Sequence, residues 1–300
     1  MQSLLGLVTN TSANISIELD GQDTRKKTTI RVKGEDPFKL LVYTGDDDIS
    51  GVVDIRLKGK NQTIKELKQN QLDIQVLYDS KQNTDFMSMS RELEPVGTLL
   101  DDKKFKFLFP KFEKQMETYY GNTAKIRYFL RVTINRQYGQ KIQQNQDFAV
   151  ILPNPQIEKL ENNIIRLEVG IQECLHIEFE FSKDKYHLKD CLIGKVSFLL
   201  VKIRIKHMQL QIIKQETTYN NGQPNKDNDT LVDFEIMDGC PRKGEVIPIR
   251  LYLSGVDLTP SYTETSYSKF QVKHFINLIL IDDEGKRYFK QQEITVYRKK

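Results

Sequence analysis

Hydrophobic and polar residues alternate with a period of two along most of this chain, which is the pattern of half-buried β-strands. The clearest stretch runs from Arg166 to Glu216. In its segment LHIEFEF, Leu175–Phe181, every second residue is apolar and the residues between are charged or polar. Strands with one polar face belong to antiparallel sheets that pack on a second sheet. The pattern therefore predicts stacked antiparallel sheets.

The alternation changes phase once within this stretch. Val201, Ile203 and Ile205 define an apolar face, and Met208 continues that face three residues after Ile205. A slip of one residue turns every later side chain to the opposite face unless an extra residue absorbs it. We therefore predict a β-bulge or a sharp bend at His207–Met208.

The first half of the chain consists of short alternating segments that are separated by turn residues such as Asp20-Gly21. The expected strands are Ile15–Leu19, Thr28–Val32, Phe38–Tyr43, Gly51–Leu57, Leu72–Tyr78, Phe86–Leu93, Lys104–Phe109, Lys125–Asn135 and Asp147–Leu152. Only Gln62–Gln71 has a spacing that allows a helix, and a polar loop fits it equally well. Because no amphipathic helices separate the strands, we expect an all-β fold.

An internal repeat indicates two copies of one sandwich. Tyr43 precedes Gly51 by eight residues, and Tyr186 precedes Gly194 by the same interval. The segments IRYFLRVTI and VKHFINLIL form a second similar pair at nearly the same offset. The run that begins at Leu152, with two prolines and many polar residues, is the best linker. We expect a first domain over 1–153, a linker over 154–165 and a second domain over 166–300.

The length and composition of the chain agree with this division. A length of 300 residues suits two small sandwiches better than one. The net charge of +4 is small for this length and does not call for a nucleic-acid partner. Three cysteines are too few for a disulfide framework, so we expect a reducing compartment. We expect neither a signal peptide nor a membrane span.

Motifs of catalysis are missing from the sequence. It contains no phosphate-binding loop, dinucleotide fingerprint, nucleophile elbow or HExxH zinc helix, so we predict no catalytic residues and no cofactor. One alternative is a tetrahedral zinc site made of Cys174, His176, His187 and Cys191. Their spacing is not that of a zinc knuckle, and free cysteines usually pack as small hydrophobic residues, so we predict no metal.

The segment FEIMDG places Ile236 and Met237 immediately before a turn. Neighbouring residues on a strand point to opposite faces, so two adjacent apolar residues cannot both face one core. We expect one of them to be exposed and to form part of a partner surface. The alternative is that both pack into the loop.

Long segments between Arg166 and Lys299 resemble the arrestin-like subunit of retromer, the vacuolar protein sorting-associated protein 26 family. The best matches are EVGIQECLHIEFEFSKDKYHLKD, GKVSFLLVKIRIKHMQLQIIKQE, FEIMDGCPRKGEVIPIRLYLSG and DDEGKRYFKQQEITVYRK. The likeness is looser from Ile15 to Leu152, where DGQDTRKK, ISGVV and GNTAKIRYFLRVTI are the anchors. It implies two tandem arrestin-like (immunoglobulin-like) β-sandwiches joined by a short linker, and no catalysis.

The resemblance also implies a function and partners. Members of this family belong to a cytosolic coat on endosomes that returns membrane cargo to the trans-Golgi or the cell surface. The loop with Ile236 and Met237 is expected to bind the large α-solenoid subunit. A phosphoinositide-binding sorting nexin would meet the region between the sandwiches and provide indirect membrane contact. Cargo tails with an aromatic-x-leucine-like motif would add there as a strand, with Val169 and Phe289 receiving the apolar side chain.

Two rival functions and one departure stay open. An arrestin-domain adaptor that recruits a ubiquitin ligase would need proline-tyrosine ligand motifs, and none is visible. A zinc enzyme would need the cysteine and histidine set described above. The acidic turn of Asp46, Asp47 and Asp48 departs from the family pattern, so its role is not transferred from the resemblance.

Overall fold

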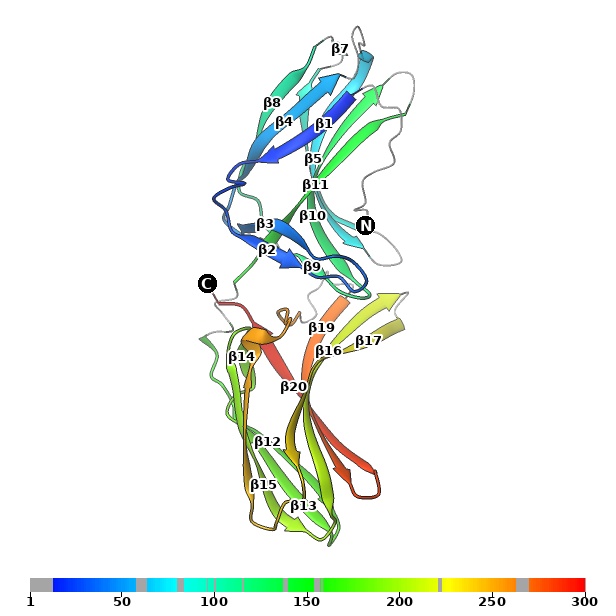
Figure 1. Ribbon diagram of the computed structural model, residues 1–300. Coiled ribbons are helices and arrows are strands. Elements are labelled where there is room, and N and C mark those ends of the chain that lie inside the picture. The colour runs from blue at the N-terminus through cyan, green and yellow to red at the C-terminus, as the bar shows by residue number, and fades with distance from the viewer. Residues whose placement is uncertain are drawn as a thin grey trace. The chain divides into compact units, whose positions relative to one another are not determined.

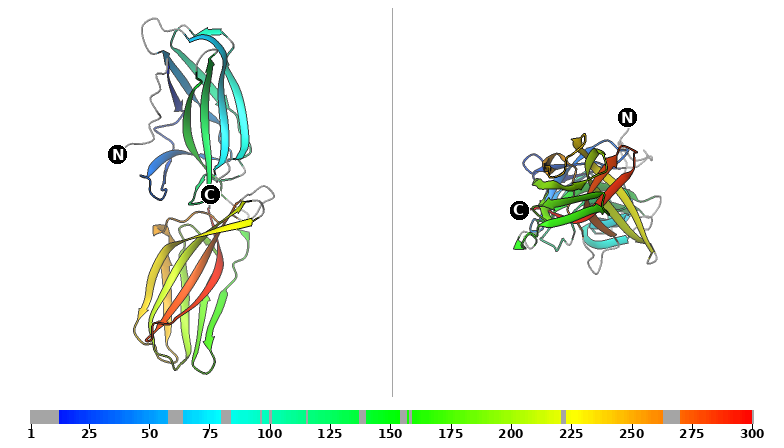
Figure 2. Two further views of the ribbon diagram at one scale, coloured as in Figure 1. Left: turned by 90° about the vertical axis from the view of Figure 1, so that its right-hand side faces the viewer. Right: turned by 90° about the horizontal axis from the view of Figure 1, so that it is seen from below.

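The computed structural model describes residues 13–57, 64–79, 84–95, 97–99, 101–114, 116–136, 140–153, 157, 159–220, 223–262 and 270–299. The chain folds as two compact units, residues 1–152 and 153–300. Each unit is a β-sandwich, so the structure confirms the predicted all-β fold (Figures 1 and 2). In the described part of the chain, no helix has the length and apolar character that crossing a membrane requires.

The first unit contains a smaller and a larger sheet. The smaller sheet has the strand order β1-β4-β8, and its strands are β1 (Ala13–Leu19), β4 (Ile49–Leu57) and β8 (Lys103–Phe109). The larger sheet has the order β2-β3-β11-β10-β5-β6, with β7 beside β5 and β9 beside β10. Its strands are β2 (Lys27–Ile30), β3 (Phe38–Thr44), β5 (Ile64–Asp79), β6 (Thr84–Glu94), β7 (Gly97–Leu99), β9 (Tyr119–Tyr120), β10 (Lys125–Arg136) and β11 (Ile142–Ile151).

The second unit has the same two-sheet arrangement. Its smaller sheet has the order β12-β13-β15-β18, with β12 (Ile165–Ile171), β13 (Leu175–Phe181), β15 (Cys191–Val201) and β18 (Val246–Tyr252). Its larger sheet has the order β14-β20-β19-β16-β17, with β14 (Lys185–His187), β16 (Ile205–Asn220), β17 (Gln223–Asp238), β19 (Phe270–Asp282) and β20 (Arg287–Tyr297). A single 3-10 turn, η1 (Leu253–Gly255), follows β18.

The repeat in the sequence marks equivalent places in the two units. β3 pairs in parallel with the end of β11, and β14 pairs in parallel with the end of β20. Tyr43 lies opposite Val150 in the first unit, and Tyr186 lies opposite Val296 in the second. Both tyrosine rings are fully buried. Each larger sheet therefore contains the same parallel pair, and in the first unit β2 adds outside it.

The repeated glycines occupy the middle of the smaller sheets. Gly51 lies on β4 between β1 and β8, and Gly194 lies on β15 between β13 and β18. A Cβ atom at Gly51 would lie 2.1 Å from the carbonyl oxygen of Glu18, and one at Gly194 would lie 2.6 Å from that of Glu180. Neither position has room for a side chain, which explains why both copies carry glycine.

The core of the second unit lies between its two sheets. Its buried residues are the inward-facing members of the alternating strands: Ile177, Phe179 and Phe181 on β13 face Met208, Leu210 and Ile212 of β16 and Ile276, Leu278 and Leu280 of β19 across the sandwich. The alternation that predicted the strands is thus also the pattern of burial.

The predicted irregularity after Ile205 is present but lies slightly earlier than expected. β15 ends at Val201 in the smaller sheet and β16 begins at Ile205 in the larger one, so residues 202–204 carry the chain between sheets. Ile205 lies opposite Asp282, and His207 lies opposite Ile281, the neighbour of Asp282 on β19. Lys206 is therefore the extra residue that absorbs the phase change.

The expectation of a helix or loop over Gln62–Gln71 is wrong from residue 64 onward, while residues 62 and 63 lie outside the described residues. β5 begins at Ile64 and pairs antiparallel with β10 on one side and β6 on the other. The local sequence KELKQNQ has no strand period, but β10 pairs with it from Leu67 onward, and β7 and then β6 pair with its other edge. Tertiary pairing therefore decides the conformation of this segment.

Part of the expected linker, residues 154–156 and 158, lies outside the described residues. β12 begins at Ile165, the last residue of the expected linker. Just before it, Asn163 donates hydrogen bonds to Asp184 from its main-chain nitrogen at 3.0 Å and from its side-chain amide at 2.9 Å. The end of this segment is thereby fixed to the second unit.

Candidate protein-binding surfaces

The first candidate surface lies on β17, one of the two edge strands of the larger sheet in the second unit (Figure 1). β17 pairs antiparallel with β16, with Met237 opposite Met208 and Glu235 opposite Gln209. Ile236 lies between these two pairs and has no residue opposite it, so it forms a β-bulge. Ile236 and Met237 are both half-buried and both pack against the core.

The expectation that one of these two residues is exposed is therefore wrong. It assumed strict alternation, and the bulge at Ile236 removes it at this point. The exposed apolar residue is instead Phe234, whose side chain is 42% exposed although it lies opposite the buried Leu210. Sequence reasoning missed Phe234 because regular alternation assigns it to the core.

Four apolar residues of this edge strand are at least partly exposed, and we refer to them as the β17 strip: Val232, Phe234, Ile236 and Met237. Val232 is also half-buried and packs against the core. The strip is thus a part of the core that its own sandwich covers incompletely. Such a surface suits a protein partner better than it suits water.

The loop after the strip is held in one conformation. Gly239 has a φ of +120°, which favours glycine, and its nitrogen donates a hydrogen bond of 2.9 Å to the carbonyl oxygen of Lys206. The Nε atom of Arg204 lies 3.0 Å from the sulfur of Cys240 and 3.1 Å from a carboxylate oxygen of Asp283. These contacts fix the position at which the strip ends.

The second candidate surface is the margin of the second sandwich between β12 and β20. β12 is an edge strand that pairs with β13, and β20 pairs with β14 only over Thr295–Tyr297. The outer edge of β20 before Thr295 therefore has no strand partner among the described residues. β12 and β20 also contact each other, so both open edges border the same margin.

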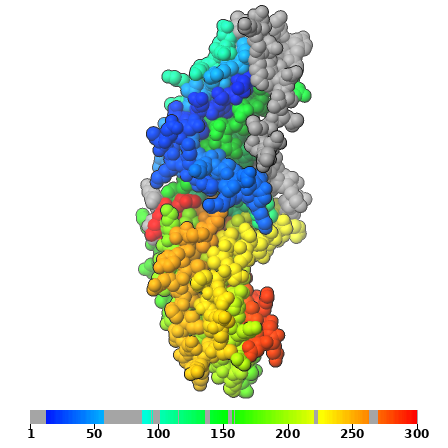
Figure 3. Space-filling model, viewed as in Figure 1, coloured from blue at the N-terminus to red at the C-terminus, as the bar shows by residue number. Residues whose placement is uncertain are grey.

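The two residues assigned to cargo by the resemblance lie on these two edge strands. Val169 on β12 is half-buried and packs against the core. Phe289 on β20 is 71% exposed, more than any other large apolar side chain among those described. The end of the β19–β20 hairpin projects from the second unit (Figures 1 and 3).

A hydrogen-bond network holds the base of this hairpin. Asp282 accepts hydrogen bonds from the hydroxyl of Tyr288 at 2.9 Å and from the main-chain nitrogens of Lys286 and Glu284 at 2.8 and 3.1 Å. Desolvation opposes ionisation of this carboxyl, but the hydrogen bonds outweigh it and lower its pKa. The ring of Tyr288 packs against the core, so its neighbour Phe289 is held outward.

A comparison with protein families decides the identity of the chain. Residues 9–285 match the family model of the vacuolar protein sorting-associated protein 26. The chain belongs to the vacuolar protein sorting-associated protein 26 family. The resemblance found in the sequence is thereby confirmed.

Relatives of the same name cover nearly the whole chain. The vacuolar protein sorting-associated protein 26 of Plasmodium falciparum is 45% identical over 301 residues, which cover 99% of both chains. That of Dictyostelium discoideum is 43% identical over 96% of this chain and 83% of its own length. The human vacuolar protein sorting-associated protein 26B is 40% identical over 96% of this chain and 85% of its own length.

In this member of the vacuolar protein sorting-associated protein 26 family, the four residues of the alternative zinc site do not gather. Cys174 immediately precedes β13 and His176 lies on it in the smaller sheet, whereas His187 lies on β14 in the larger sheet. Among the described residues, the groups within reach of one metal ion are Glu168–His176–Glu178 and His207–Glu235–Asp238. Cys174, His187 and Cys191 belong to neither group, so these four residues do not have the geometry that the alternative zinc site needs.

The acidic turn that departs from the family pattern is bound within the first unit. Asp47 accepts hydrogen bonds from the nitrogen of Thr44 at 2.7 Å and from Arg25 at 3.2 Å. Desolvation acts against its ionisation, but these hydrogen bonds and the charge of Arg25 lower its pKa. Asp48 accepts from the nitrogen of Lys111 at 2.6 Å, and Asp46 pairs with the ammonium of Lys111. These carboxylates therefore organise the turn itself.

Proposed function

We propose that this chain is the arrestin-like subunit of a retromer coat and that it acts as a non-catalytic scaffold and cargo adaptor. Its membership of the vacuolar protein sorting family supports this role. In this proposal the protein is cytoplasmic and peripheral on the cytosolic face of endosomes. It works by presenting surfaces to other proteins in endosome-to-Golgi and endosome-to-plasma-membrane retrieval.

The observation that carries the proposal is the β17 strip. Its four apolar residues lie at a sheet edge, three of them half-buried and Phe234 42% exposed, and the adjoining loop is held by Gly239 and Arg204. We assign this strip to the large α-solenoid subunit. A rigid apolar surface loses little conformational entropy on binding, so most of its burial contributes to affinity. Few residues of such a surface carry most of the binding energy.

We assign the β12–β20 margin to the cytosolic tails of membrane cargo. Open strand edges provide main-chain donors and acceptors for an added strand, and alternate side chains of that strand enter pockets. Val169 and Phe289 lie on the two edges, so an aromatic or leucine side chain of the tail would contact them. A phosphoinositide-binding sorting nexin would complete this site and provide the indirect contact with the endosomal membrane.

The proposal is tested by a pull-down of the solenoid subunit with the double variant Ile236→Asp and Met237→Asn. We expect the variant to lose the solenoid subunit and to stay a folded monomer. A matched control replaces two exposed apolar residues on the smaller sheet, Ile193→Asp and Leu199→Asn, and should bind normally. Normal co-purification of the first variant, or equal loss in the control, would count against the proposed site.

A further inference from the structure

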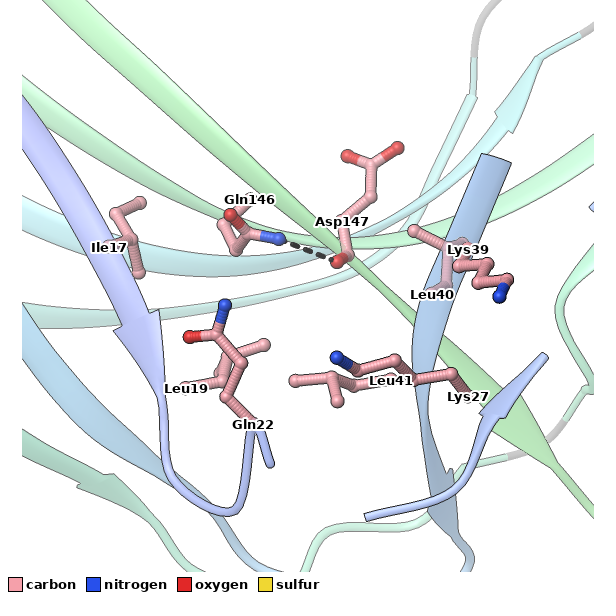
Figure 4. Close-up of a pocket in the computed structure, with 9 residues that line it drawn as sticks. All are labelled: Ile17, Leu19, Gln22, Lys27, Lys39, Leu40, Leu41, Gln146 and Asp147. Carbon is pink, nitrogen blue, oxygen red and sulfur yellow. Dashed lines mark hydrogen bonds between the residues drawn. The ribbon is translucent and has the colours of Figure 1, made fainter. Parts of the chain in front are cut away.

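The first unit contains a cavity of about 220 Å³ that the function proposed above does not use (Figure 4). Strands β1, β3 and β11 contribute to its wall, together with β2 and the turn after β1. Its apolar lining consists of Ile17, Leu19, Leu40 and Leu41. The cavity therefore combines an apolar floor with polar residues from neighbouring elements.

The cavity lies where two paired strands part. β3 pairs with β11 only over Val42–Thr44, which lie opposite Ala149–Ile151. Leu40 and Leu41 precede the paired segment of β3, and Gln146 and Asp147 precede that of β11. On the other side, β1 pairs with β4, and no strand of the described residues pairs with the second edge of β1. The cavity is thus bordered by an open strand edge.

The charged groups of the cavity leave a surplus of positive charge. Lys27 and Lys39 line it, and no hydrogen bond or ion pair is found for either ammonium within the described residues. The carboxylate of Asp147 is held by Arg127 through hydrogen bonds of 2.8 and 3.0 Å, and in Figure 4 it points away from the apolar side chains. Lys27 extends alongside Leu41 in the same view. An anionic group next to an aliphatic one would complement this arrangement.

The size of the cavity limits its occupant. Binding sites for drug-sized ligands and cofactors have volumes of roughly 300–1,000 Å³. A cavity of about 220 Å³ is smaller than this range and suits one or two amino-acid side chains. An extended peptide can place such side chains two residues apart on one face while its main chain follows the edge of β1.

We propose that this cavity binds an extended acidic peptide. The peptide adds to the open edge of β1, its carboxylate or phosphate lies at Lys27 and Lys39, and an aliphatic side chain two residues away packs on Leu19 and Leu41. This site goes beyond the cargo margin of the second unit. It rests on the proposed adaptor function only for the source of the peptide, which would be the cytosolic tail of a membrane protein.

The test measures binding of fluorescent seven-residue peptides to the full chain by fluorescence polarisation. The reference peptide has glutamate at its third position, leucine at its fifth, and serine or threonine elsewhere. Two further peptides replace the glutamate by phosphoserine or by glutamine, and a fourth moves the leucine next to the glutamate. We expect the glutamate and phosphoserine peptides to bind, and the other two to bind at least fivefold more weakly, because they lack the anion or turn the leucine to the opposite face.

The decisive variant is Lys27→Glu with Lys39→Glu, which should weaken binding of the two anionic peptides at least tenfold. A control with the same change in net charge, Lys33→Glu with Lys106→Glu, alters two exposed lysines that do not line the cavity and should bind within twofold of the natural protein. Equal loss in this control, equal binding of the glutamine peptide, or no binding of either anionic peptide would overturn the proposal.

Two further measurements separate this peptide site from a lipid site and from the β17 strip. Flotation with phosphatidylcholine vesicles, with and without phosphatidylinositol 3-phosphate, asks whether a lipid headgroup occupies the cavity. Vesicle binding that needs Lys27 and Lys39, in the absence of peptide binding, would overturn the proposal. The variant Ile236→Asp with Met237→Asn should bind the peptides normally, so failure of the solenoid site and failure of this site are distinguishable.

Discussion

Met237 lies directly opposite Met208 in the β16–β17 ladder, and the residue before it, Ile236, has no residue opposite it. This one inserted residue lets two neighbours in the sequence pack against the same core. It also marks the end of the apolar strip on the sheet edge. A local feature of strand pairing therefore shapes the surface that we assign to the solenoid subunit.

Phe234 should contribute more to solenoid binding than to folding. Its exposed 42% corresponds to roughly 85 Å² of a phenylalanine side chain, and its burial by a partner would contribute about 2 kcal/mol. We expect Phe234→Ser to weaken binding of the solenoid subunit about tenfold or more, measured by isothermal titration calorimetry. Thermal unfolding should shift by only a few degrees. Unchanged affinity would remove Phe234 from the binding surface.

Phe289 offers a corresponding test of the cargo margin. Its side chain is 71% exposed on the open edge of β20, so Phe289→Ala should leave stability unchanged and weaken a tail peptide with an aromatic-x-leucine motif about tenfold. Fluorescence polarisation in the presence of the sorting nexin measures this affinity. Tyr252→Ala is the matched control, because Tyr252 is 64% exposed on β18, at the far edge of the smaller sheet from β12. A similar loss in both variants would contradict the assignment.

The repeated glycines should be required for stability in both units. In Gly51→Ala and Gly194→Ala the new methyl group would approach main-chain oxygens at 2.1 and 2.6 Å, so strands must move apart. We expect each variant to lose about 1–3 kcal/mol of stability in urea unfolding followed by circular dichroism. Gly255→Ala, where no atom lies within 4 Å of the new methyl group, should change stability by less than about 0.5 kcal/mol. Unchanged midpoints for the first two variants would show that the sheets accommodate a side chain there.

Features that depend on local alternation could be predicted from the sequence. The segment Leu175–Phe181 coincides with β13 because one face of this strand is buried and the other is not. The repeat of Gly51 and Gly194 indicated two copies of one sandwich, and the structure explains it because each of these positions excludes a side chain.

Features that depend on pairing between distant strands could not be predicted. Residues 64–71 form a strand because β10 pairs with one edge and β7 and β6 pair with the other, and their own polar sequence does not indicate this. The bulge at Ile236 is visible only once Met208 and Gln209 are placed opposite its neighbours. The cavity beside Lys27 and Lys39 arises where β3 and β11 diverge. These strands are more than 90 residues apart in the sequence, so their local patterns do not indicate that they pair.

We expect His274 to make the stability of the second unit dependent on pH. The nitrogen of Val296 donates a hydrogen bond of 3.0 Å to the hydroxyl oxygen of Ser261, and that hydroxyl lies 3.0 Å from Nδ1 of His274. The imidazole is fully buried on β19 opposite Lys214 of β16. Burial, and to a smaller extent the charge of Lys214, lower the pKa of His274 to about 3.

Because this folded-state pKa lies below the unfolded value of about 6.5, the unfolded chain binds more protons between these two values. The contribution of the neutral, buried imidazole to the stability of the folded unit is therefore fully present above pH 6.5 and is lost as the pH falls toward 3. At pH 5.5 the loss relative to pH 7.4 should be about 1 kcal/mol from this residue. Urea unfolding at both pH values measures this loss of stability. The variant His274→Gln keeps a polar group for Ser261, and its stability should depend on pH less than that of the natural protein, by the contribution of His274. An identical pH dependence in the variant would show that His274 does not carry the effect.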